Sequence, residues 1–145
     1  MPRYRGFDNP FGDIWLNLDG VIIKRDVASQ PSDVYTTTNS EDYGDDEAAM
    51  NKMTSVGKVV AKDGNISAFN LGETAEIIPS ETNGNNSQYM CDNVWGAGGN
   101  LERRTLLVGG SAYWGSSYGL GCFGSHHGVG WATSYGGFRT LNKKV

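Results

Sequence analysis

Residues 109–139 read GGSAYWGSSYGLGCFGSHHGVGWATSYGGFR, and this stretch decides how the chain can fold. It contains ten glycines and seven aromatic residues, and Arg139 is its only formally charged residue. Each glycine in a helix interior costs about 1 kcal/mol, and interior glycines also weaken a strand. We therefore expect an ordered, irregular surface that bends at its glycines and carries aromatic rings between them.

This composition is typical of a recognition surface. Tyr and Trp supply large, rigid contact areas at low entropic cost, while Ser and Gly provide adaptable hydrogen bonding. Sugar rings also stack on aromatic faces of this kind. The alternative, which the sequence leaves open for each ring, is that the aromatic side chains fill the core of a small β domain.

Two enzyme-like motifs in the segment lack the context that their chemistry needs. Residues 115–119 (GSSYG) match the G-x-S-x-G nucleophile elbow, but no Asp or Glu follows residue 102 to complete a triad in chain order. Residues 119–124 (GLGCFG) match G-x-G-x-x-G, but no helix is expected there and no acid follows about 20 residues later. Both matches are attributed to the high glycine content, and the chain is expected not to be an enzyme.

The histidines and cysteines are not expected to form a metal or catalytic site. In an extended chain, the adjacent side chains of His126 and His127 would point to opposite faces, and no acid lies nearby in the sequence. We interpret them as loop imidazoles available to a ligand. Cys91 and Cys122 are too few for a disulfide scaffold, and free thiols are the default expectation. No cofactor or metal is predicted.

The bulk composition fits one folded domain, residues 1–145. The net charge of −4 argues against a nucleic-acid binder, since the basic pairs Arg103-Arg104 and Lys143-Lys144 are short and are interpreted as solvated charges. No stretch is long or apolar enough to insert in a membrane, and the first nine residues lack the apolar core of a signal peptide.

The rest of the chain is expected to contain one N-terminal helix and several short strands. Asn9 and Pro10 suit the start of a helix over residues 9–20, with an apolar face formed by Phe11, Ile14, Trp15 and Leu18, and Asp19-Gly20 then makes a turn. Strand character is found in residues 21–25, 33–38, 56–61, 76–79, 89–95, 105–108 and 138–141.

An acidic stretch lies between two of these strands. Residues 41–47 (EDYGDDE) hold five acids, and Ser40 could cap a short helix that runs on to Met53. Calcium binding of the EF-hand type needs acids at alternate positions, a glycine at position six and Glu at position twelve, and this spacing is absent. Acids in the first turn of a helix are the preferred interpretation.

Four pieces of the sequence, in this order, resemble a known family. They are residues 5–15 (RGFDNPFGDIW) followed by Asp19-Gly20, residues 89–92 (YMCD), residues 106–111 (LLVGGS) and residues 137–139 (GFR). The series resembles the C-type-lectin-like domains of bacteriophage and prophage receptor-binding proteins, including variable proteins diversified by retroelements. The same fold is found, more distantly, in formylglycine-generating enzymes.

The resemblance implies an α+β, C-type-lectin-like fold with mixed and antiparallel strands, one or two short helices and long ordered loops. It also implies ligand contact by side chains between Gly110 and Gly137, which by position are Tyr113, Trp114, Ser117, Tyr118, Phe123, His126, His127, Trp131 and Tyr135.

The chain departs from the relatives of this fold in three respects. The enzymes use a copper-binding cysteine pair near the final strand, whereas here one cysteine precedes Gly109-Gly110 and the other follows it by twelve residues. The Glu-Pro-Asn loop of calcium lectins has no equivalent. Trp114 and Trp131 fit poorly with adenine-directed diversification.

The expected function is that of a virion-surface domain, from a phage tail or head fibre, that binds a bacterial cell-surface glycan or protein. Its partners would be that receptor and other virion proteins, in a homo-oligomer for which a trimer is one option, made in the host cytoplasm. The first alternative is a decoration protein that binds only other virion proteins. The second is a polysaccharide hydrolase, with Asp45, Asp46 and Glu47 as its candidate carboxylates.

Overall fold

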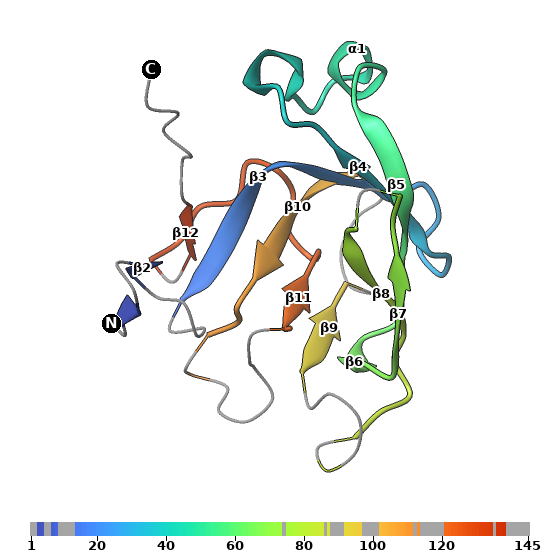
Figure 1. The fold of residues 1–145 in the computed structure, drawn as a ribbon, viewed down its shortest axis with the longest axis vertical. Helices are drawn as coiled ribbons and strands as arrows, with labels where there is room; N and C mark the ends of the chain where they lie inside the picture. The colour runs from blue at the N-terminus through green and yellow to red at the C-terminus, as the bar shows by residue number, and fades with distance from the viewer. Residues whose placement is uncertain are drawn as a thin grey trace.

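The architecture is dominated by one curled, mixed sheet of eight strands with very little helix (Figure 1). The computed structural model describes residues 3–4, 7–8, 14–73, 75–85, 87, 92–96, 102–111, 113, 121–134 and 136–138. The strands of the main sheet are β3 (Trp15–Lys24), β4 (Ser32–Thr36), β5 (Thr54–Val59), β6 (Gly64–Asn65), β9 (Asn93–Trp95), β10 (Arg103–Val108), β11 (Phe123–Gly124) and β12 (Gly136–Phe138).

Strand β3 is the axis of this sheet. Its antiparallel neighbour on one side is β10, and its other side is shared by β12, which runs parallel to its first residues, and β4, which runs antiparallel to its last four. The pairing with β10 shifts between Leu18 and Ile22, and Gly20 in this bulge has a φ of 80°. A side chain at residue 20 would lie 2.7 Å from the carbonyl oxygen of Thr37, so the bulge requires glycine.

The helix predicted over residues 9–20 is wrong for the part that the structure describes. Trp15 begins strand β3, and Asp19-Gly20 forms a bulge inside that strand and does not end an element. Residues 9–13 lie outside the described part of the chain. An apolar spacing that spans only eight residues is weak evidence for a helix, and pairing with β10 and β12 overrides this local helical pattern.

Most of the other predicted strands are confirmed. Residues 33–38, 56–61, 76–79 and 105–108 correspond to β4, β5, β8 (Ile77–Glu81) and β10, and residues 21–25 form the second half of β3. For residues 89–95 and 138–141, only β9 and the end of β12 are described. A two-stranded sheet, β1 (Arg3–Tyr4) with β2 (Phe7–Asp8), precedes them all.

The acidic stretch forms two short helical turns where one helix was predicted. The 3-10 turn η1 (Ser40–Asp42) is capped by Asn39, and the four-residue helix α1 (Glu47–Met50) is capped by Asp46, whose Oδ1 accepts a hydrogen bond of 2.7 Å from the backbone N–H of Ala49. Acids in first turns are confirmed, although Ser40 is not the cap.

A second hairpin closes the curl of the main sheet. Strands β7 (Ala68–Leu71) and β8 pair antiparallel beside β5 (Figure 1). The N–H of Val60 at the end of β5 donates to the carbonyl of Pro79 in β8 at 3.0 Å, and the hydroxyl of Thr82 donates to the carbonyl of Lys62 near β6 at 3.0 Å. The hairpin therefore connects β5 at one edge of the main sheet with the region of β6 at the other edge.

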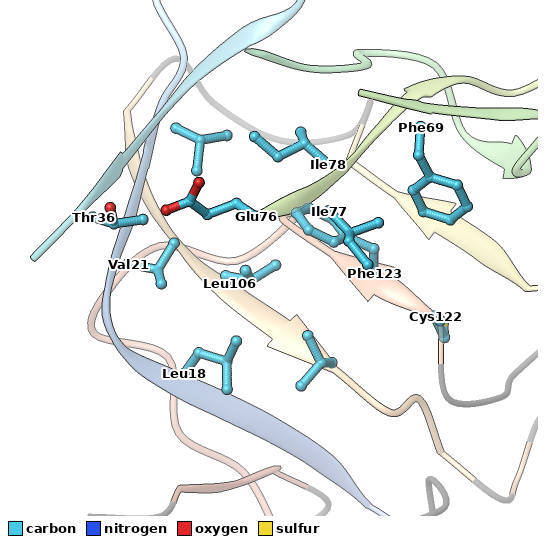
Figure 2. A pocket seen from close by; sticks show the side chains of 13 residues that line it. Leu18, Val21, Thr36, Phe69, Glu76, Ile77, Ile78, Leu106, Cys122 and Phe123 are labelled. Atoms are coloured by element: carbon cyan, nitrogen blue, oxygen red, sulfur yellow. The ribbon is translucent and has the colours of Figure 1, made fainter. Parts of the chain in front are cut away.

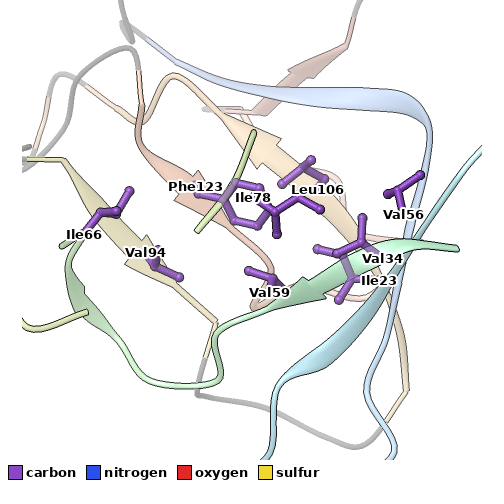
Figure 3. Close-up of a cluster of buried hydrophobic side chains, with 9 residues drawn as sticks. All are labelled: Ile23, Val34, Val56, Val59, Ile66, Ile78, Val94, Leu106 and Phe123. Atoms are coloured by element: carbon purple, nitrogen blue, oxygen red, sulfur yellow. The ribbon is translucent and has the colours of Figure 1, made fainter. Parts of the chain in front are cut away.

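The side chains between the sheet and this hairpin form the main core (Figure 3). We call the side of β10 that carries Leu106 the inner face and the side that carries Leu107 the outer face. The buried members of the inner core are Ile23, Val34, Val56, Val59, Ile66, Ile78, Val94, Leu106 and Phe123. On the outer face, Leu107 packs with Trp15 and Cys122, and Ile22 packs beneath α1 with Met50 and Met53. Burial on both faces explains the continuous apolar run of residues 105–108.

None of the helices in the described residues is long and apolar enough to cross a membrane.

Candidate functional site

Two glycines carry the chain from the sheet into the Gly- and aromatic-rich segment. Gly109 and Gly110 follow β10 directly, with φ angles of 82° and 67°, a left-handed conformation that favours glycine. Ser111 next to them is still buried, whereas the ring of Tyr113 is 86% exposed. The chain thus passes within a few residues from a largely buried strand to a nearly fully exposed aromatic side chain.

The segment returns to the same place in the sheet. Strand β11 pairs antiparallel with the end of β10, Val108 facing Phe123, and the N–H of Gly109 donates to the carbonyl of Cys122 at 3.3 Å. The N–H of Gly121 donates to the carboxylate of Asp92 at 2.9 Å. Both ends of the loop are therefore fixed by hydrogen bonds. Of the predicted ligand contacts, Trp114, Ser117, Tyr118 and Tyr135 lie outside the described residues.

Gly124 in β11 permits the close approach of Trp15. A Cβ atom at residue 124 would lie 3.2 Å from two ring carbons of Trp15 and 3.3 Å from the Cβ of Leu107. The packing of β11 against the outer core thus requires that residue 124 has no side chain. Phe123, by contrast, is one of the predicted contacts that is buried in the inner core, with 7% of its surface exposed.

The two histidines lie side by side, so the expectation that they point to opposite faces is wrong. The ring centroids of His126 and His127 are 4.0 Å apart, and the ring of His127 stacks on Trp131 at 4.2 Å with an interplanar angle of 11°. His126 also meets Trp15 edge to face at 6.1 Å. The backbone bends at His127 and then turns over residues 128–131, where the N–H of Trp131 donates to the carbonyl of Gly128 at 3.0 Å. Extended-strand geometry therefore does not apply.

Both imidazoles are held in the neutral form near pH 7. Burial lowers the pKa of His126, although its hydrogen bond with the Trp95 carbonyl and the charge of Asp63 oppose the shift. Burial, with the neighbouring His126 and Arg104, lowers the pKa of His127 to about 4. Among the described residues no three His, Cys, Asp or Glu side chains come together as metal ligands.

The buried guanidinium of Arg104 holds the backbone just before the two histidines. Arg104 is fully buried, and its Nη1 donates to the carbonyl of Ser125 at 2.8 Å. Arg25 is 2% exposed, and its Nε donates to the hydroxyl of Ser32 at 3.2 Å. The interpretation of Arg103-Arg104 as solvated charges is therefore wrong for Arg104. Its partner lies 21 residues away in the sequence, and nothing local in the sequence indicated the contact.

A cavity of about 630 Å³ opens between the inner face of the sheet and the β7–β8 hairpin (Figure 2). Its lining is almost entirely apolar and comes from the sheet, the hairpin and residues 121–123 of the aromatic segment. The lining residues are Leu18, Val21, Val34, Thr36, Phe69, Glu76, Ile77, Ile78, Leu106, Val108, Gly121, Cys122 and Phe123. Sequence reasoning missed this site, although the alternation of Leu106 and Val108 with Leu107 could have indicated that two apolar side chains share one face.

Two of the three candidate carboxylates of the acidic stretch have structural contacts. Asp46 caps α1, and the carboxylate of Glu47 pairs with Arg103 and Lys24, so both are engaged in local contacts. Asp45 is exposed. In the G-x-G-x-x-G match, the described residues 121–124 form a turn and strand β11 with no helix.

Cys122 is a free, buried thiol, and desolvation raises its pKa to about 12. A thiol in this state is inert towards nucleophilic chemistry at neutral pH. Cys91 lies outside the described residues.

Comparison of the chain with protein-family models, with curated proteins and with solved structures finds no match.

Proposed function

We propose that this chain is a virion-surface domain of a phage tail or head fibre, with a C-type-lectin-like fold, and that it binds a bacterial surface glycan or protein through residues 110–137. The resemblance in the sequence gains support from the way its pieces are combined. The opening piece ends in β3, the Gly-Gly piece begins in β10, and the closing piece overlaps β12, and β3 pairs with both of the other two strands.

The observation that carries the proposal is the position of Tyr113. Tyr113 is 86% exposed, yet it lies four residues after Gly109, whose N–H is hydrogen-bonded to the carbonyl of Cys122, next to strand β11. An exposed aromatic ring on a fixed framework loses little conformational entropy when it binds, which is the physical basis of a preorganised recognition surface.

The chemistry of the segment favours a neutral ligand surface. The described residues between Gly109 and Phe138 include no Asp, Glu, Lys or Arg, and both histidines are neutral near pH 7. Contact would rest on ring stacking and neutral hydrogen bonds, which suits sugars and uncharged protein surfaces. Weak single sites of this kind gain about 10²–10⁴ in avidity when a fibre presents several copies.

Binding of the labelled, purified protein to intact candidate host bacteria tests the proposal. We expect saturable binding that Tyr113→Ala weakens about tenfold or more, as for a central aromatic contact. The matched control is Val27→Ala, which shortens another exposed apolar side chain outside the segment and should leave binding unchanged. Equal binding by the Tyr113→Ala variant and the parent, with both folded, contradicts the assignment of the surface.

A decoration protein that binds only other virion proteins is the second candidate. The observation that favours it is a pair of exposed apolar side chains, Leu71 and Ile77, which lie opposite each other in the β7–β8 hairpin and are 74% and 66% exposed. Exposed apolar pairs are suited to an assembly interface. Under this alternative, Leu71→Ser would abolish incorporation into virions, whereas Tyr113→Ala would leave both incorporation and host attachment intact.

A further inference from the structure

The cavity between the sheet and the hairpin has firm walls. Four of its lining residues, Val34, Ile78, Leu106 and Phe123, belong to the buried core and are each at most 7% exposed. They come from four different strands that are fixed by the sheet and by the hairpin. The cavity is therefore formed by the packing of the core itself, as in ligand sites that exist before the ligand arrives.

The size and the lining of the cavity indicate a small, mostly apolar ligand. Its volume of about 630 Å³ falls within the usual ~300–1,000 Å³ of small-molecule sites. Aliphatic side chains and the rings of Phe69 and Phe123 make up nearly all of the wall. A sugar would lose its hydrogen bonds to water there without replacement, so carbohydrate is disfavoured in this cavity.

Glu76 is the one charged residue among the described residues that line the cavity. Figure 2 shows its carboxylate directed into the cavity, between Thr36 and the isoleucines of β8. The position of this residue is fixed, because the N–H of Gly72 donates to the Glu76 carbonyl at 2.8 Å and the carboxylate packs so closely on Gly72 that a larger residue at 72 would meet it. A carboxylate only accepts hydrogen bonds, so it selects for a donor.

We propose that this cavity binds an apolar molecule that carries one amine, with its hydrocarbon part between the sheet and the hairpin and its ammonium group beside Glu76. Burial of the hydrocarbon supplies the affinity, and the carboxylate supplies the orientation. An alkyl carboxylate of the same length is rejected by like charge. The lining includes residues 121–123 of the aromatic segment but not Tyr113, and the inference does not depend on the proposed function.

Calorimetric titration with three probes of equal chain length tests the inference: dodecylamine, dodecanol and dodecanoate, each below its micelle concentration. We expect one saturable site per chain, with dodecylamine bound about tenfold more tightly than dodecanol and dodecanoate bound most weakly. Absence of saturable dodecylamine binding overturns the proposal. Dodecanoate bound as tightly as dodecylamine overturns the role of Glu76.

Two matched pairs of variants separate this site from general attraction of a cation to an acidic protein. Glu76→Gln should reduce dodecylamine affinity about tenfold and leave dodecanol unchanged, whereas Glu73→Gln, in the same turn but outside the cavity lining, should change neither. Ile77→Ser should weaken both probes severalfold, whereas Leu71→Ser, its exposed cross-strand neighbour outside the lining, should weaken neither. Equal effects within either pair contradict the site, whatever the outcome of the host-binding experiment.

Discussion

The two faces of β10 bury adjacent leucines in different surroundings. On the inner face, Leu106 belongs to an aliphatic core that also borders an open cavity of about 630 Å³. On the outer face, Leu107 is fully buried among Trp15, Cys122 and the partly buried Trp131, whose ring stacks on His127. The inner face leaves room for another molecule, whereas the aromatic residues of the outer face pack against one another and against Leu107. Aromatic content alone therefore does not identify a binding surface in this chain.

Substitution of the two leucines tests this difference most strongly. Leu107→Ala should lower the free energy of unfolding by about 4 kcal/mol, because the outer core surrounds this side chain completely. Leu106→Ala should cost about 2 kcal/mol, because its site already opens on the cavity and can be solvated there. Urea unfolding followed by tryptophan fluorescence gives both values. Equal costs, or a larger cost for Leu106→Ala, would show that the cavity is closed in solution.

A substitution that disturbs the packing of β11 against the outer core should give the next largest change in the free energy of unfolding. Gly124→Ala should cost about 1–3 kcal/mol, because the new methyl group would press on the Trp15 ring and on Leu107. Gly130→Ala is the matched control in the same segment, since nothing lies within 4 Å of its Cβ position, and it should change the stability by less than about 0.5 kcal/mol. Thermal unfolding of the two variants decides the point. If both changes are neutral, Trp15 does not pack against β11 as described.

The same contrast explains what the sequence could predict. Strands such as β4, β5 and β10 were recognised because β-branched and apolar runs carry their own local pattern. The first half of β3 was missed because its partners, β10 and β12, lie about 90 and 120 residues later in the chain. Whether a ring is buried also depends on contacts between segments that are not adjacent in the sequence. Phe123 enters the core because β11 pairs with Val108, while Tyr113 stays exposed after the left-handed glycine pair, and ring chemistry does not distinguish them.

The prediction of the site residues from the sequence was limited in the same way. The segment from Gly110 to Gly137 was identified by composition, but the stack of His127 on Trp131 depends on a turn at Gly128 that extended geometry did not anticipate. The cavity was missed because its lining comes from six strands and two loops, and no continuous stretch contains enough of it to form a motif.

The outer face should also be the more sensitive to acid. The pKa of His127 in the folded chain, about 4, lies below the value of about 6.5 expected in the unfolded chain. As the pH falls from about 6.5 towards 4, the unfolded state binds a proton that the folded state does not, so stability is lost. Because His127 is only half-buried, we expect roughly 1 kcal/mol after screening by solvent. Burial shifts His126 in the same direction.

His127→Phe isolates this contribution, since it keeps a ring against Trp131 and removes the titrating group. The stability difference between parent and variant, from urea unfolding at pH 7 and pH 4.5, cancels the contributions of the carboxylates that titrate in both proteins. We expect the parent to lose more stability on acidification than the variant. The opposite order would mean that His127 is protonated favourably in the folded state.

The smallest effect should come from the exposed charges beside this core. Arg103 neighbours the buried Arg104 in β10, but its guanidinium pairs with Glu47 at the surface, where Lys24 also approaches that carboxylate at 3.9 Å. Glu47→Gln should cost no more than about 0.5 kcal/mol, because solvent screens the pair and two long side chains lose entropy to form it. The difference from the parent should vanish in 1 M NaCl, where the screening length is about 3 Å. A cost of several kcal/mol that persists in 1 M NaCl would mean that the ion pair between α1 and β10 is shielded from solvent. Charge pairs would then stabilise the outer face as much as aromatic packing does.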